Sequence, residues 1–160
     1  MFFMSMNPKR LLNVTLFITM MLATPALLKA QRVAGDVGIG LQIGEPSGLS
    51  IATYRPNGVG IDILAAWDLD RFLYVNPHAI YSTHVGNSEA LHFFFGPGGF
   101  VGMYEQSDGD YNVRGGISGT AGFSLMLGRF EMYLRGTPRL RLIEETQADI
   151  GGGLGLRYWL

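Results

Sequence analysis

The chain has 160 residues, a length typical of one domain, and contains no cysteine, which excludes disulfides and thiolate metal sites. Hydrophobic residues make up 48% of it and charged residues only 16%, whereas roughly 25% charged residues is usual. There are also 23 glycines, about twice the average share. Low charge with abundant glycine indicates a surface that contacts something other than water.

The first thirty residues have the pattern of a secretory signal peptide. Lys9 and Arg10 form a basic segment, residues 11–28 are mostly apolar, and Ala30 is a small residue suited to cleavage. We therefore expect residues 1–30 to be a signal peptide and residues 31–160 to form the folded domain. An uncleaved membrane anchor is the alternative, but the apolar stretch is near the lower limit of about 17–25 residues for spanning, and Pro25 interrupts it.

Cleavage after Ala30 changes the charge balance. It leaves nine basic residues, all of them arginine, against thirteen acidic ones, so the mature net charge is −4. Because the remaining chain has no basic patch, nucleic acid is not an expected partner.

The rest of the chain alternates between apolar residues and small or polar ones, which is the pattern of strands with two different faces. Short turns such as Asn57-Gly58 separate the alternating segments. In chain order, the expected strands are residues 36–44, 48–55, 59–68, 72–83, 90–105, 113–127, 130–143 and 148–160. An even number of strands in a meander brings both ends of the chain to the same side.

The strand predicted at 130–143 shows the two faces most clearly. Phe130, Met132 and Leu134 alternate with Glu131 and Arg135. In a soluble barrel the apolar face would fill the core, whereas in an outer-membrane barrel it contacts lipid and the polar face lines the interior. Glycines and a few opposite charges suit the narrow interior of a small barrel. We therefore predict an all-β fold, an eight-stranded antiparallel up-and-down transmembrane β-barrel, with a soluble secreted barrel as the alternative.

Four aromatic residues lie near the ends of predicted strands. Trp67, Tyr81, Tyr158 and Trp159 are placed where an aromatic girdle contacts the membrane surface.

Four segments resemble a known family. They are "GIGLQIGEPSGLS" at 38–50, "GIDILAAW" at 60–67, "LYVNPHAIY" at 73–81 and "DIGGGLGLRYWL" at 149–160. They resemble small, mostly uncharacterised bacterial outer-membrane β-barrel proteins of the OmpA/OmpX-like eight-stranded group. The resemblance extends from about Gly35 to Leu160, and its most specific piece is the hairpin at 40–50.

This resemblance implies a monomer in the outer membrane of a Gram-negative bacterium, surrounded by outer-membrane lipid. It also implies recognition by the barrel assembly machinery during insertion, through a C-terminal signal formed by Tyr158, Trp159 and Leu160. Members of the group usually end on an aromatic residue, whereas this chain ends on leucine.

The polar faces of the strands supply a candidate network in the barrel interior. Its expected members are Asp62, His78, Arg114, Glu131, Arg135 and Arg157. Eight strands leave an interior just wide enough for side chains, so we expect a structural network and no open pore. The expected function is a structural, integrity or surface-interaction role, with residues 105–112 as the segment that would contact a partner. A soluble lipocalin-like carrier of a small apolar ligand is the alternative.

The histidines and a nearby serine are candidates for metal binding or catalysis. His84 and His92 are expected to approach each other in a hairpin, but no third residue has the spacing of a metal ligand. Ser82, His84 and Glu89 are the one local set that suits a lipid-modifying enzyme, although they match deacylase motifs poorly. We therefore expect no catalytic residues, no metal and no cofactor.

Overall fold

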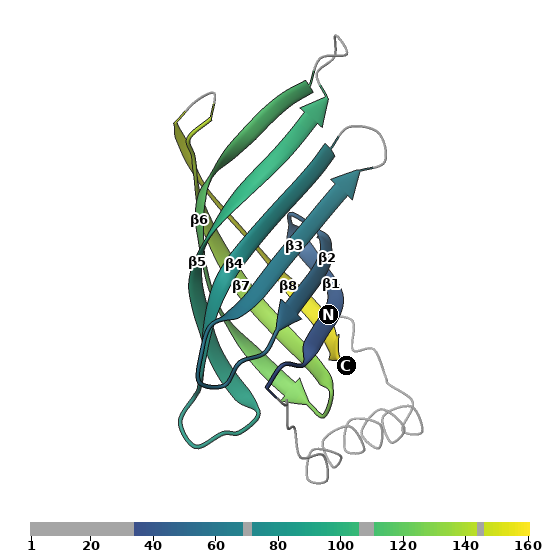
Figure 1. The fold of residues 1–160 in the computed structure, drawn as a ribbon, viewed down its shortest axis with the longest axis vertical. Helices are drawn as coiled ribbons and strands as arrows, with labels where there is room; N and C mark the ends of the chain where they lie inside the picture. The colour runs from purple at the N-terminus through teal and green to yellow at the C-terminus, as the bar shows by residue number, and fades with distance from the viewer. Residues whose placement is uncertain (1–33, 69–71, 106–110, 144–145) are drawn as a thin grey trace, which may run out of the picture.

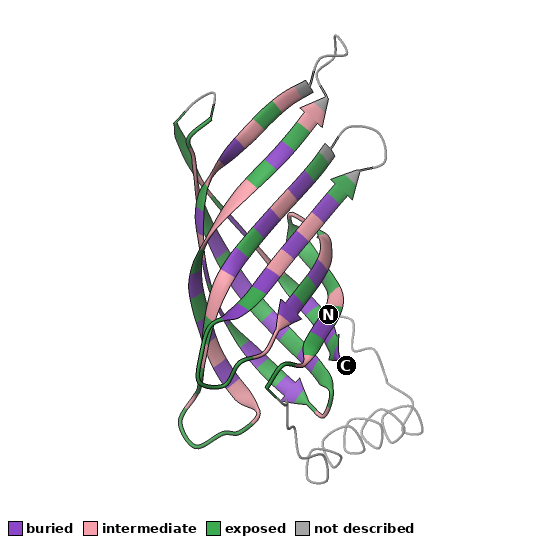
Figure 2. Cartoon of the chain, viewed as in Figure 1, coloured by how far each residue is buried: buried purple, intermediate pink, exposed green. Residues whose placement is uncertain are grey.

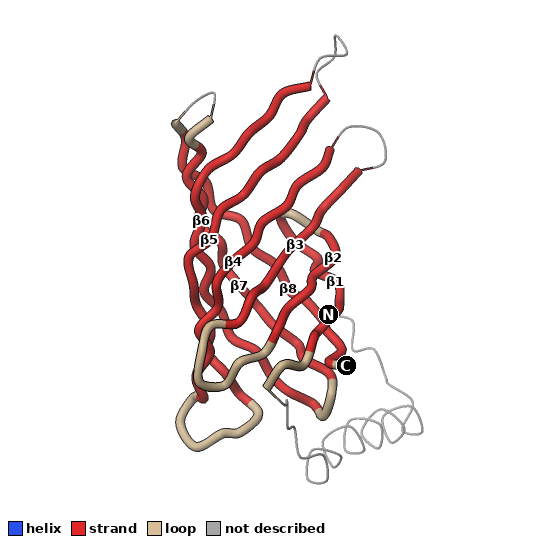
Figure 3. The backbone as a smooth tube through the Cα atoms, in the orientation of Figure 1, coloured by secondary structure: helices blue, strands red, loops and turns tan. Residues whose placement is uncertain are grey.

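The computed structural model describes residues 34–68, 72–105, 111–143 and 146–160, and it is a closed antiparallel β-barrel (Figure 1). Strands make up most of the described backbone (Figure 3). They are β1 (Val37–Glu45), β2 (Gly48–Thr53), β3 (Gly60–Asp68), β4 (Phe72–His84), β5 (Leu91–Glu105), β6 (Tyr111–Leu127), β7 (Phe130–Arg141) and β8 (Gln147–Trp159). The predicted all-β fold with eight antiparallel strands is therefore confirmed. The expected signal peptide lies outside the described residues.

Within the described segments, no helix is long and apolar enough to cross a membrane.

Three strand boundaries differ from the predicted ones by two residues, and others differ by one. β7 ends at Arg141, two residues before the predicted end at 143. β2 ends at Thr53, two residues early, although the N–H of Tyr54 still donates to the carbonyl of Asp36; the chain then turns at Pro56 and Asn57. β6 begins at Tyr111, two residues early, because Tyr111 and Asn112 continue the ladder with β5. The strands β4 to β8 have 12 to 17 residues, whereas β1 to β3 have six to nine. The wall of the barrel is therefore lowest at the β1–β2 hairpin (Figure 1).

The two ends of the chain close the barrel. β1 pairs with β8 from Gly38 opposite Trp159 to Glu45 opposite Gly152. The N–H of Leu160 then donates to the carbonyl of Val37 at 3.0 Å. The apolar residues at the end of the sequence therefore belong to the last strand.

Buried and exposed residues alternate along the strands (Figure 2), and the buried ones are mostly polar. Among the described residues, thirteen buried side chains are polar or charged and eight are hydrophobic. On the outer face, Leu134 is 60% exposed and Ile43 is 77% exposed. This distribution is the reverse of that in a soluble protein, whose apolar side chains gather in the core.

Glycines make room for large rings in the interior. At four glycines, an added Cβ would collide with a ring on the neighbouring strand, so each of these glycines leaves a hollow that the ring occupies. The pairs are Gly38 with Trp159, Gly98 with His78, Gly122 with Phe94, and Gly155 with Tyr133.

The expected aromatic girdle needs one correction. Trp67, Tyr81 and Tyr158 lie exposed on the outer face, but Trp159 is only 2% exposed and points into the barrel. Successive residues of a strand face opposite sides, so Tyr158 and Trp159 cannot both belong to an outer girdle.

Candidate functional site

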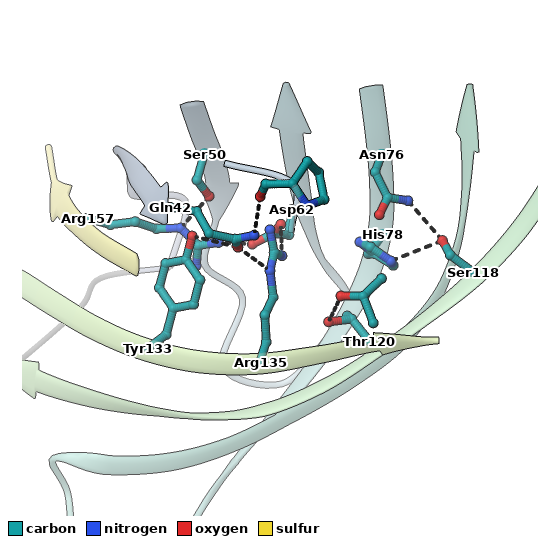
Figure 4. A network of polar contacts seen from close by, with 12 residues as sticks. Gln42, Ser50, Asp62, Asn76, His78, Ser118, Thr120, Tyr133, Arg135 and Arg157 are labelled. Carbon is teal, nitrogen blue, oxygen red and sulfur yellow. Dashed lines mark hydrogen bonds and ion pairs between the residues drawn. The ribbon is translucent and has the colours of Figure 1, made fainter. Parts of the chain in front are cut away.

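The centre of the polar interior is Asp62 on β3 (Figure 4). Its carboxylate accepts a hydrogen bond from Nη1 of Arg135 on β7 at 2.7 Å, and a second from Nη2 of Arg157 on β8. All three side chains are at most 5% exposed. One carboxylate thus joins three strands through two buried ion pairs.

The two guanidinium groups make further contacts that compensate their burial. Arg157 donates from Nε to Ser50 at 2.8 Å, and its Nη1 lies 3.4 Å from Oε2 of Glu131. Arg135 donates from Nε to Oε1 of Gln42 at 2.6 Å. Two arginines therefore meet two carboxylates, and the group is electrically balanced. We call it the Asp62 cluster; its members are Gln42, Ser50, Asp62, Glu131, Arg135 and Arg157.

Aromatic residues hold the Asp62 cluster in place. The guanidinium carbon of Arg157 lies 4.0 Å from the centre of the Tyr133 ring, a cation–π contact. The indole N–H of Trp159 donates to Oε2 of Glu131 at 3.1 Å. The last aromatic residue of the chain is therefore a member of the interior network.

A second polar group contains His78. Its Nε2 lies 3.1 Å from the hydroxyl of Ser118, and Asn76 donates to the same hydroxyl at 2.8 Å and to the carbonyl of Gly99 at 2.7 Å. These contacts join β4, β5 and β6, and Figure 4 shows them beside the Asp62 cluster. Every strand of the barrel thus contributes to one of the two groups.

Arg114 lies apart from both groups. It is half-buried, with its guanidinium carbon 4.7 Å from the centre of the Tyr104 ring, and it lines a cavity of about 260 Å³ in the upper half of the barrel. Arg139 and Arg141 line the same cavity, and Nε of Arg139 lies 2.5 Å from Oδ1 of Asp149. We call this space the arginine cavity.

At the opposite end, where the chain termini lie, the interior is filled. The cavity there has a volume of only about 30 Å³, enough for a water molecule or two. Asp62, Glu131 and Trp159 line it. This end has no room for a larger ligand.

The structure places the other residues considered for chemistry at this same end. The rings of His84 and His92 lie 4.5 Å apart, as residues opposite each other in the β4–β5 ladder, and Ser82 lines the small cavity. In the parts of the chain that the structure describes, no group of three or more histidine, cysteine or acidic side chains is arranged to hold a metal ion.

The interior network predicted from the sequence lacks several of its members, although the alternation of the strands pointed to them. Gln42 lies between Leu41 and Ile43 and so shares the inward face of its strand. Ser50 and Ser118 hold corresponding places on β2 and β6. The alternation identified their direction, but it did not show that they bind the charged groups.

The fold and the interior define a closed eight-stranded antiparallel β-barrel stabilised by a polar network. No protein-family model matches the sequence, and no curated protein is similar to it.

Proposed function

We propose that this protein is an outer-membrane β-barrel of a Gram-negative bacterium, related to the OmpA/OmpX-like group, with its apolar outer face in lipid. The observation that carries the proposal is the inverted distribution of side chains. A lipid-facing surface favours exposed Leu, Ile, Phe and Val, and it penalises outward-facing charges. On β7, Glu131 and Arg135 are buried, while Met132 and Leu134 are exposed.

The extent of the apolar surface also favours this proposal over a soluble barrel. Twenty-eight large hydrophobic residues are exposed among the described residues, and each of the eight strands carries at least one of them on its outer face. Monomeric soluble proteins rarely expose apolar patches larger than a few hundred Å². A barrel also leaves no unpaired backbone along its closed part, as a bilayer core requires.

The ends of the barrel suggest its orientation. Tyr81 and Tyr158 lie exposed near the end that holds the chain termini, and Trp67 lies exposed near the other end. An exported chain reaches the outer membrane from the periplasm, so we place the termini on the periplasmic side. In this proposal residues 1–30 direct export, and Tyr158, Trp159 and Leu160 form the signal for the assembly machinery.

The interior is filled at the end that holds the chain termini, which supports a structural or surface-interaction role without catalysis or conduction. The Asp62 cluster crosses the barrel from β1 and β2 to β7 and β8, and its two arginines pair with its two carboxylates. A monomer of this kind would stabilise the membrane or present its upper end to a partner.

Cell fractionation tests the proposal. The protein should be found in the outer-membrane fraction, and an unheated sample should migrate faster on a denaturing gel than a boiled one, because a closed barrel resists detergent. A variant lacking Tyr158, Trp159 and Leu160 should lose this fast-migrating form. Recovery of the intact protein in the soluble periplasmic fraction would refute the membrane assignment.

A further inference from the structure

The barrel wall has a notch on one side. The β1–β8 ladder ends at Glu45 opposite Gly152, whereas the β7–β8 ladder continues to Arg141 opposite Gln147. On the other side of the hairpin, the β2–β3 ladder ends at Leu49 opposite Ala65, although β3 continues to Asp68. Figure 1 shows the β1–β2 hairpin ending well below the upper ends of the other strands.

The arginine cavity lies behind this notch. Glu45 and Pro46, at the tip of the short hairpin, form its rim on that side, and Arg114, Arg139 and Arg141 approach from β6 and β7. The cavity is therefore bounded on that side by the lowest part of the wall.

The charges of the cavity favour an anion. Among the residues that the structure describes, three guanidinium groups and two carboxylates, Glu45 and Asp149, line the cavity, and Asp149 already binds Arg139. The Nε of Arg141 is buried and has no acceptor within the described residues, while its Nη1 donates to Gln147 at 3.2 Å. Guanidinium groups bind phosphate through paired hydrogen bonds, so a phosphate group matches this arrangement.

The outer surface beside the notch is strongly apolar. Ile43 is 77% exposed and Ile150 is 78% exposed, the two largest values among the exposed hydrophobic residues described. Ile43 precedes the hairpin tip, and Ile150 lies on the part of β8 beyond the last pair with β1. An alkyl chain that left the cavity through the notch would meet these two side chains.

We propose that the arginine cavity binds the phosphate group of an amphipathic lipid, whose alkyl chain passes over the notch onto Ile43 and Ile150. The unpaired backbone at the notch then lies at the depth of lipid headgroups, where polar partners are present, because open sheet edges are not tolerated in the hydrocarbon region. The lipid source of the phosphate rests on the proposed membrane location. The binding of phosphate to the arginines does not.

The test uses the purified protein in a neutral maltoside detergent, with binding followed by calorimetry and by the phosphorus NMR line width of the probe. Three probes separate the possible sources of affinity: decyl phosphate, inorganic phosphate and decyltrimethylammonium. We expect decyl phosphate to bind at one saturable site, inorganic phosphate to bind more weakly, and the cationic probe not to compete.

Matched variants locate the site. Arg114→Gln and Arg141→Gln should each weaken decyl phosphate binding roughly tenfold or more, as expected for the loss of a charge-assisted hydrogen bond. Arg55→Gln, an exposed arginine in the turn at the opposite end, removes the same charge and should leave binding unchanged. Ile150→Ser should weaken binding of decyl phosphate but not of inorganic phosphate. Each variant is first checked for the fast-migrating folded form.

The possible results are decisive. If folded Arg114→Gln and Arg141→Gln bind decyl phosphate as tightly as the parent does, the cavity is not the site. If inorganic phosphate binds as tightly as decyl phosphate, the ligand is a free anion and the lipid assignment is wrong. If the cationic probe binds equally well, the surface recognises only the alkyl chain. Because the titration is made in detergent, its failure leaves the fractionation result untouched, and the reverse also holds.

Discussion

Arginine placed on the outer face of β7 should destabilise the barrel according to its depth in the bilayer. Leu134 is the central position to change: it is 60% exposed and lies between Phe123 of β6 and Leu154 of β8 in the register of the sheet. Met132 and Phe130 lie on the same face of the same strand, two and four residues nearer the terminal end. The three positions form a series that differs mainly in depth.

The structure sets the expected magnitudes. Phe130 packs edge-on against Tyr158, with ring centres 5.1 Å apart, and marks the aromatic level at the terminal end. Leu134 is four residues further along a strand that rises about 3.3 Å per residue at a tilt of about 40°, which places it about 10 Å deeper. The apolar band of a transmembrane barrel is about 25 Å tall, so the proposed membrane location would place Leu134 near the midplane. Leu134→Arg should cost about 2–4 kcal/mol and Phe130→Arg about 0–1 kcal/mol, with Met132→Arg between them.

Equilibrium unfolding by urea in phosphatidylcholine vesicles measures these costs. Each arginine variant is compared with alanine at the same position, so that the loss of apolar contacts cancels and the depth-dependent cost of the charge remains. In a soluble barrel the outer face is wet, and arginine would be tolerated at all three positions. If the arginine and alanine variants have the same free energy of unfolding at all three positions, the assignment of this face to lipid is refuted.

Two further pairs of substitutions test the interior. Gly155→Ala places a methyl group inside the Tyr133 ring and should cost about 1–3 kcal/mol, whereas Gly136→Ala, which has no atom within 4 Å of the added Cβ, should be close to neutral in the same unfolding assay. Asp62→Asn leaves two buried guanidinium groups without their shared carboxylate and should cost about 3–5 kcal/mol. Asp149→Asn breaks a partly exposed pair and should cost at most about 1 kcal/mol; equal losses for the two aspartates would contradict the central role of the Asp62 cluster.

The strands and their faces could be predicted because the two-residue period is a local property. Leu134 and Arg135 are adjacent in the sequence, and one faces outward while the other is buried. The ends of strands were predicted less well, since they depend on partners. β6 includes Tyr111 because Glu105 lies opposite it in the ladder. The sequence pattern alone places Tyr111 in the polar loop before the strand.

Alternation also does not state which inward residues meet. Asp62 and Arg157 are 95 residues apart in the sequence, and the closure of β1 onto β8 brings them together. Arg114 shares the inward direction with Arg135 but lies at a different height, so it contacts Tyr104 in the arginine cavity. Height along the axis depends on the stagger of all the ladders, which no single strand contains.

The excess of glycine is connected to the charged site. Gly155 has no side chain, so the Tyr133 ring lies flat over the backbone of β8. In that position the ring contacts the guanidinium of Arg157, and its hydroxyl lies 3.4 Å from Oε1 of Gln42. The glycine therefore positions the ring, and the ring positions two members of the Asp62 cluster. Such ring and glycine pairs fill the terminal half of the interior, where the two arginines of the Asp62 cluster lie against its two carboxylates. In the other half, where the wall is notched, Arg114, Arg139 and Arg141 line a cavity, and we propose that an anion from outside the protein binds there.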